Sequence, residues 1–267
     1  SHGVSVSMYM FHGGTNFWYM NGANTSGGFR PQPTSYDYDA PLGEWGNCYP
    51  KYHAFREVIQ KYLPEGTVLP EVPADNPTTT FATVELKESA PLTTAFHQTT
   101  QSEEVLSMED VGMDFGYIHY QTTIQKAGKR KLIIQDLRDY AVILIDGKQV
   151  ASLDRRYNQN SVTLNVQKAP ATLEILVENT GRVNYGPDIL FNRKGITSQV
   201  LWGDEKLTGW SVTPLPLYKE KVAEMNFGET IKGVPAFHKG TFTVQKKGDC
   251  FVDMSQWGKG AVWVNGK

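Results

Sequence analysis

The side chains best suited to chemistry lie between positions 8 and 42, where aromatic residues, glycines and carboxylates are concentrated. Trp18, Tyr19 and Asn21 follow a short apolar run, and an aromatic platform of this kind can stack on a sugar ring or on the sugar of a leaving group. Packing of the same loop on a neighbouring domain explains these three residues equally well. The segment therefore predicts half of a sugar-binding site.

Two predicted elements must position this loop. A helix from about Pro50 is indicated by apolar side chains at roughly 3.6-residue spacing. A short buried strand before the loop is indicated by the apolar residues Val4, Val6, Met8, Met10 and Phe11. Gly13 and Gly14 let the backbone turn sharply where that strand ends. Strand, loop and helix together form one unit of a (β/α)8 barrel, a fold whose chemistry lies on the loops after the strands.

Three motifs in this order carry a family resemblance: MYMFHGGTNF, NGAN and TSYDYDAPL, followed by a helix over residues 51–63. Together they closely resemble the last barrel strand and loop of β-galactosidases of glycoside hydrolase family 35. The resemblance continues more loosely at DFGYIHYQTTI, ILVENTGRVNYG and WGKGAVWVNGK, so that it covers nearly the whole chain. It implies a retaining exo-β-galactosidase that releases terminal β-D-galactose, in which one glutamate attacks the anomeric carbon and a second donates a proton to the leaving oxygen. No cofactor is needed for that reaction.

The resemblance also assigns the residues of the loop. It implies that Tyr38, the second tyrosine of SYDYD, contacts galactose near the nucleophile, although a tyrosine packed in the barrel rim is the alternative. Both catalytic glutamates are expected upstream of Ser1, so no catalytic residue is assigned in this chain. Asp37 and Asp39 are instead expected to accept backbone N–H bonds and brace the loop. Trp18 stands where family members generally carry a small residue, and its indole is expected to narrow the entrance.

The rest of the chain predicts β-sandwiches. Short alternating strands are expected at FATVEL, GYIHYQTTI, KLIIQDL, YAVILIDGKQVASL, SVTLNV and ATLEILVEN. Asp146-Gly147 predicts a tight hairpin turn, because both positions tolerate a positive φ angle. Tryptophans on strands of alternating pattern are expected to fill sandwich interiors: Trp202, Trp210, Trp257 and Trp263.

Four segments follow from these patterns: a final barrel unit at 1–63, a proline-rich linker at 64–79, a first β-sandwich at 80–215 and part of a second at 216–267. GAVWVNGK at the end repeats AVILIDGK at 141–148, which favours the second, related sandwich. One barrel unit cannot close a barrel, so we expect the remaining barrel portion upstream in the same polypeptide and a chain that is truncated at both ends. The predicted fold class is mixed α/β and all-β.

Composition limits the partners. With 26 Lys and Arg against 28 Asp and Glu, the net charge of −2 favours neither nucleic acid nor an anionic membrane, and no apolar run approaches the roughly 20 residues of a membrane helix. Cys48 and Cys250 are too few for a disulfide framework or a metal cluster. We therefore expect a β-galactoside as the partner, no metal, and, from the resemblance alone, a secreted, periplasmic or lysosomal location.

Two other functions remain open. A non-catalytic galactose-binding module would explain the sandwiches and the lack of a catalytic pair, but it would have no use for the loop motifs and the helix. A family relative acting on β-glucosaminides would keep the fold and the mechanism while changing contacts to the sugar. Hydrolysis of matched aryl glycosides distinguishes all three functions.

Overall fold

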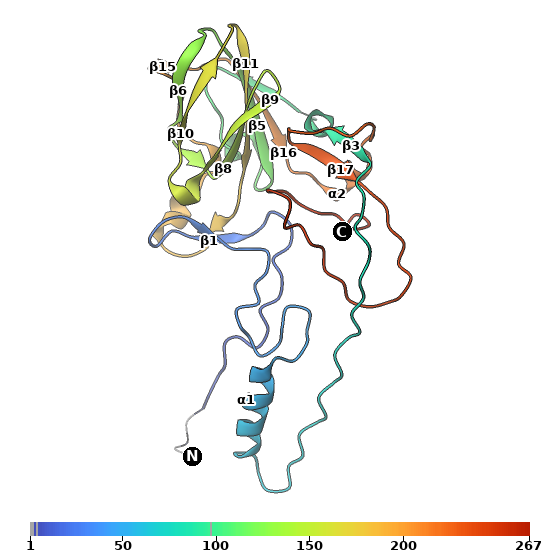
Figure 1. The fold of residues 1–267 in the computed structure, drawn as a ribbon. Coiled ribbons are helices and arrows are strands. Elements are labelled where there is room, and N and C mark those ends of the chain that lie inside the picture. The colour runs from blue at the N-terminus through green and yellow to red at the C-terminus, as the bar shows by residue number, and fades with distance from the viewer. Residues whose placement is uncertain (1–2, 4, 97) are drawn as a thin grey trace. The chain divides into compact units, whose positions relative to one another are not determined.

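The computed structural model describes residues 3, 5–96 and 98–267, which divide into two compact units (Figure 1). Unit 1 comprises the described residues of Ser1–Phe17, Pro33–Val84 and Phe242–Gly260. Unit 2 comprises the described residues of Trp18–Gln32, Glu85–Thr241 and Ala261–Lys267. The predicted domain boundaries do not coincide with these units, because the first 63 residues contribute to both of them.

Unit 2 is a two-layer β-sandwich with antiparallel pairing in both main sheets. The larger sheet has the order β4 (Thr100–Ser102), β16 (Trp210–Leu215), β5 (Tyr117–Ile124), β11 (Ala171–Glu178), β8 (Tyr140–Ile145) and β9 (Lys148–Asp154). The second sheet faces it in the order β10 (Ser161–Val166), β6 (Gly128–Ile134), β14 (Val200–Trp202) and β15 (Glu205–Lys206) (Figure 1). The predicted β-sandwich is confirmed.

One apolar core fills the space between the two sheets, because alternate side chains along each strand point inward. Trp202 and Trp210 are 1% and 0% exposed, as predicted for tryptophans inside a sandwich. The same prediction is wrong for Trp257, which is 46% exposed in an irregular segment of unit 1. No strand is formed by the described residues around it, so there is no sheet layer to cover its ring.

Three smaller sheets and several short helices complete unit 2. The sheets are β12 (Arg182–Val183), β1 (Gly22–Asn24) and β2 (Arg30–Pro31); β13 (Gly195–Ile196) with β7 (Leu137–Arg138); and β17 (Ala236–Lys239) with β3 (Glu88–Pro91). The helices are α2 (Lys219–Ala223) and the 3-10 turns η1 (Leu92–Ala95), η2 (Glu109–Val111), η3 (Arg155–Tyr157) and η4 (Pro187–Phe191). The parallel pairing of β1 with β12 fixes residues 22–24 beside the segment that follows β11.

The predicted hairpin is confirmed at Asp146-Gly147, which joins β8 to β9 with φ angles of 49° and 72°. A turn with the same signs occurs at Asn265-Gly266, where the φ angles are 52° and 76° and Val264 and Lys267 exchange two backbone hydrogen bonds of 2.9 and 3.1 Å. Its flanking residues form no strand within 242–267, so the turn is present without a ladder. The second sandwich stays a prediction.

The strand predicted at FATVEL is absent, since residues 81–87 are irregular and β3 begins only at Glu88. A strand persists when a neighbour satisfies its backbone groups, and β17 provides that neighbour to β3 alone. Residues 64–77 likewise form no helix or strand, as expected of a linker.

In unit 1, helix α1 (Pro50–Gln60) forms as predicted, with Pro50 in its first turn. The strand predicted before the loop is wrong for its described residues: 5–11 are irregular, and Val6 and Tyr9 are 82% and 88% exposed. Val4 lies outside the described residues. The described chain offers this segment only an isolated bridge between His12 and Leu42, which is not enough to hold a strand, and the barrel unit is not confirmed.

Both cysteines carry free thiols, and both lie in unit 1. Within the described part of the chain, neither α-helix has the length and the apolar surface that spanning a membrane requires.

Candidate functional site

Three carboxylates brace the loop between residues 35 and 49 of unit 1. Glu44 accepts a hydrogen bond of 2.6 Å from the Ser35 hydroxyl and a second one from the Thr15 hydroxyl. The Nε2 atom of His12 lies 3.2 Å from the Glu44 carbonyl oxygen, to which it donates a hydrogen bond when that nitrogen carries the proton. Glu44 thus connects residues 12–15 to the loop between residues 35 and 49.

Asp37 holds the next part of the loop. Its carboxylate accepts a hydrogen bond of 2.8 Å from the Tyr49 hydroxyl and bonds of 3.2 Å from the backbone N–H groups of Asp39 and Glu44. The bond from Tyr49 to Asp37 raises the pKa of the phenol, because loss of its proton would leave two negative charges side by side. The predicted bracing role of Asp37 is confirmed.

Asp39 is held by a lysine of helix α1. Lys51, in the first turn of α1, lies 2.6 Å from its carboxylate and also donates to its backbone carbonyl. The three carboxylates of this loop are therefore engaged in holding its shape. That none of them is a catalytic nucleophile or acid stays a prediction.

Tyr38 projects from the loop between the two braced aspartates. Its side chain is 71% exposed, and its ring centroid lies 5.4 Å from that of Tyr36. Tyr38 and Asp39 both adopt the left-handed conformation, with φ angles of 59° and 52°, which is unfavourable for residues with a Cβ atom. An exposed phenol on a strained and well-anchored backbone suits recognition of a substrate.

Gly13 lies directly under this loop. A Cβ atom added there would be 2.9 Å from the carbonyl carbon of Tyr36 and closer still to its oxygen. The sequence predicts a sharp turn at Gly13, but the φ angle of this residue is not positive. A glycine is required here because two backbone segments approach closely.

The other predicted substrate-binding residues lie in unit 2, whereas Tyr38 lies in unit 1. Trp18 contacts the rings of Tyr19 and Trp263 edge-on, at centroid distances of 5.6 and 5.8 Å. Tyr19 is 8% exposed and packs against Tyr117 of β5 at 5.4 Å. Its burial raises the pKa of its phenol far above the ordinary value.

Asn21 donates a hydrogen bond of 3.0 Å from its side-chain amide to the Gln32 carbonyl oxygen, across the pair formed by β1 and β2. The geometry of Trp18, Tyr19 and Asn21 fits the alternative of packing on the sandwich. Contact of these three residues with a substrate stays a prediction.

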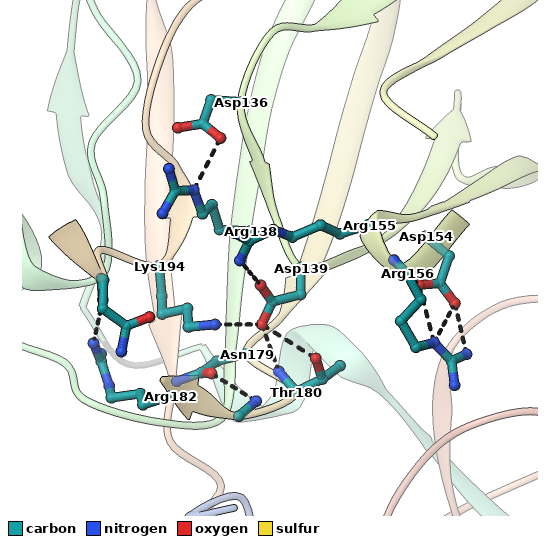
Figure 2. A network of polar contacts seen from close by, with 12 residues as sticks. Asp136, Arg138, Asp139, Asp154, Arg155, Arg156, Asn179, Thr180, Arg182 and Lys194 are labelled. Carbon is teal, nitrogen blue, oxygen red and sulfur yellow. Dashed lines mark hydrogen bonds and ion pairs between the residues drawn. The ribbon is translucent and has the colours of Figure 1, made fainter. Parts of the chain in front are cut away.

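Unit 2 contains a buried polar network that no sequence motif indicates (Figure 2). Figure 2 shows Lys194, Arg155 and Thr180 directed at the carboxylate of Asp139, at distances of 2.6, 2.9 and 3.1 Å. Asp139 and Lys194 are 1% and 0% exposed, and burial lowers the pKa of Lys194 to about 8. The ring of Phe29 lies 4.2 Å from the Arg155 guanidinium carbon and 4.7 Å from the Lys194 ammonium. The network therefore anchors residues 22–31 on the sandwich.

Among the described residues, no three His, Cys, Asp or Glu side chains are grouped so that they could hold a metal ion. Each described acidic residue of the loop is instead bonded to a hydroxyl, an ammonium or a backbone N–H group.

Three family models match consecutive parts of the chain. The model described as "Glycosyl hydrolases family 35" matches residues 1–62, "Beta-galactosidase, first all-beta domain" matches 105–216, and "Beta-galactosidase, galactose-binding domain" matches 235–267. The first match contains the braced loop, and the second contains most of the sandwich.

Curated relatives match nearly the whole chain. Proteins named β-galactosidase from Xanthomonas manihotis, Mus musculus and Homo sapiens are 40%, 37% and 34% identical to it, in each case over 99% of this chain. The chain spans 44%, 44% and 42% of the length of these relatives. A crystal structure of a GH2 β-galacturonidase from Eisenbergiella tayi is 20% identical over 50% of this chain and 25% of its own, with a TM-score of 0.28, which is too low to support an argument. The predicted resemblance to β-galactosidases of glycoside hydrolase family 35 is therefore confirmed over nearly the whole chain.

Proposed function

We propose that this chain is part of a retaining exo-β-galactosidase that hydrolyses terminal non-reducing β-D-galactose residues of oligosaccharides or glycoconjugates. The observation that carries the proposal is the braced loop: it lies in the segment matched by the family 35 model and presents an exposed phenol. From the resemblance to family 35, we place the two catalytic glutamates in a part of the polypeptide that precedes Ser1. The location proposed from the resemblance is secreted, periplasmic or lysosomal.

The exposed apolar surface of unit 1 supports an extended version of this proposal, in which residues 1–63 are the last unit of a (β/α)8 barrel. On α1, Phe55, Val58 and Ile59 are 37%, 50% and 41% exposed, and no residue of this helix is buried. A barrel helix buries such a face against its neighbours. The linker at 64–79, the sandwich at 80–215 and the partial sandwich at 216–267 complete the proposed organisation.

We assign direct contact with galactose to Tyr38 of unit 1. Separately, we keep Trp18, Tyr19 and Asn21 of unit 2 as residues predicted to contact a sugar ring or the leaving-group sugar. Tyr38 has the exposure that this role needs. Tyr19, which is buried, would act mainly by supporting the indole of Trp18 through their ring contact.

Removing the Tyr38 hydroxyl should lower activity. In the parent polypeptide, extended upstream, we expect Tyr38→Phe to reduce kcat/KM for an aryl β-D-galactoside about 10-fold, the equivalent of one lost hydrogen bond to a charged group. The same assay with the matching aryl glucoside and glucosaminide tests selectivity. Tyr185→Phe is the matched control, because Tyr185 is also exposed, at 76%, and lies in unit 2.

The three substrates separate the candidate functions. Hydrolysis selective for the galactoside supports the proposal, and selectivity for the glucosaminide would replace it with a different sugar specificity. Binding of galactose without hydrolysis of any substrate would instead identify a binding module, the function of the domain named by the model that matches residues 235–267.

A further inference from the structure

The backbone conformation of the loop requires an explanation beyond the contacts of Tyr38 itself. Two successive residues with side chains, Tyr38 and Asp39, adopt positive φ angles. Such a conformation is unfavourable for L-residues and persists where surrounding contacts enforce it. The residues that enforce it here come from the start of α1.

Both aspartates that flank Tyr38 are held by that helix start. Tyr49, the residue that precedes α1, donates its hydroxyl to Asp37 at 2.8 Å, and Lys51 in the first turn pairs with Asp39 at 2.6 Å. The Asp37 carboxylate also accepts the backbone N–H of Asp39, which closes a small turn around Tyr38. The phenol therefore projects from a backbone segment fastened on each side to a single rigid element.

We propose that Tyr49 and Lys51 are positioning residues that hold Tyr38 in its substrate-binding conformation through Asp37 and Asp39. This inference rests on the proposed function, because it concerns the same site. Neither residue contacts substrate. Tyr49 acts by orienting the Asp37 carboxylate, so that the backbone N–H groups of Asp39 and Glu44 stay bound to it.

A double-mutant cycle tests whether Tyr49 acts through Tyr38. In the parent polypeptide, Tyr49→Phe should lower kcat/KM for an aryl β-D-galactoside about fivefold, whereas the same change in a Tyr38→Phe background should lower it less than twofold. The matched control is Tyr62→Phe, an exposed tyrosine just beyond the other end of α1, which should leave activity unchanged. Equal losses in both backgrounds, or no loss in either, would overturn the inference.

Lysine and arginine at position 51 provide a second comparison. Lys51→Met should reduce kcat/KM severalfold, and Lys51→Arg should restore most of it, because the guanidinium group can also pair with Asp39. A purely apolar, structural role of the lysine stem would instead be satisfied by methionine. Full activity of Lys51→Met would contradict the role assigned to Lys51.

Hydrogen exchange tests the inference without enzymatic activity. The amides of Asp39 and Glu44 should exchange at least fivefold faster in Tyr49→Phe than in the unmodified parent polypeptide, and at an unchanged rate in Tyr62→Phe. Unchanged exchange in Tyr49→Phe would overturn the inference even in an active enzyme. Faster exchange together with a parent protein that hydrolyses no galactoside would preserve the loop mechanism and reject the proposed function alone.

Discussion

Replacing Asp139 with asparagine should lower the free energy of unfolding of the sandwich by about 3–5 kcal/mol. The reason is the environment of Lys194, whose side chain is 0% exposed and pairs with Asp139 at 2.6 Å. Asparagine preserves the size of the side chain but removes its charge, which leaves a buried ammonium group without a neutralising partner. Urea unfolding followed by circular dichroism measures the loss as a lower midpoint at constant slope.

Two further variants make this prediction sharper. Asp136→Asn removes a neighbouring carboxylate that pairs with Arg138 in a more exposed setting, at 38% and 22% exposure, and should cost about 1 kcal/mol. Adding Lys194→Met to Asp139→Asn should recover part of the loss, because no fully buried charge is then left unpaired. A loss for Asp139→Asn no larger than that for Asp136→Asn would show that Lys194 gains water or releases its proton in the variant.

The sandwich could be predicted from the sequence because the hydrophobic pattern within each strand is sufficient to indicate a strand. β5, β8, β10 and β11 each alternate buried and exposed residues or form apolar runs, and Asp146-Gly147 marks a turn by its chemistry alone. Such local signals need no knowledge of the partner strand. The strands predicted at 4–11 and 81–86 have a comparable pattern, but the described residues of these two segments have no neighbouring strand.

The polar residues show the same difference between local signals, which the sequence reveals, and contacts that only the fold creates. The bracing role of Asp37 followed from a short motif, and the role of Tyr38 in that motif stays a prediction. Lys194 and Asp139, in contrast, are 55 positions apart and neither is marked by its local sequence. A lysine in a polar segment predicts an exposed side chain, and only the fold shows that this one is buried. The contact between Gly13 and the Tyr36 carbonyl is likewise visible only in the fold, because the sequence around a glycine does not indicate which backbone segment approaches it.

That contact leads to the second large effect: Gly13→Ala should reduce kcat/KM of the parent polypeptide for an aryl β-D-galactoside by about 100-fold. The new methyl group would overlap the Tyr36 carbonyl, and this neighbour is backbone, so it cannot rotate away as a flexible side chain would. Residues 36–39 must therefore shift, and Tyr38 with them. Steady-state kinetics of the purified variant gives the measurement.

The effect of Gly13→Ala should be confined to the loop. Gly258→Ala, in the same unit, is the matched control, because its Cβ atom would meet no heavy atom within 4 Å and its φ angle is not positive. We expect the control to keep activity, and both variants to keep the urea midpoint of the sandwich, since neither glycine belongs to unit 2. Activity of Gly13→Ala within twofold of the unmodified protein would show that the Tyr36 carbonyl can move without displacing the phenol, and the close approach at Gly13 would then have no part in placing Tyr38.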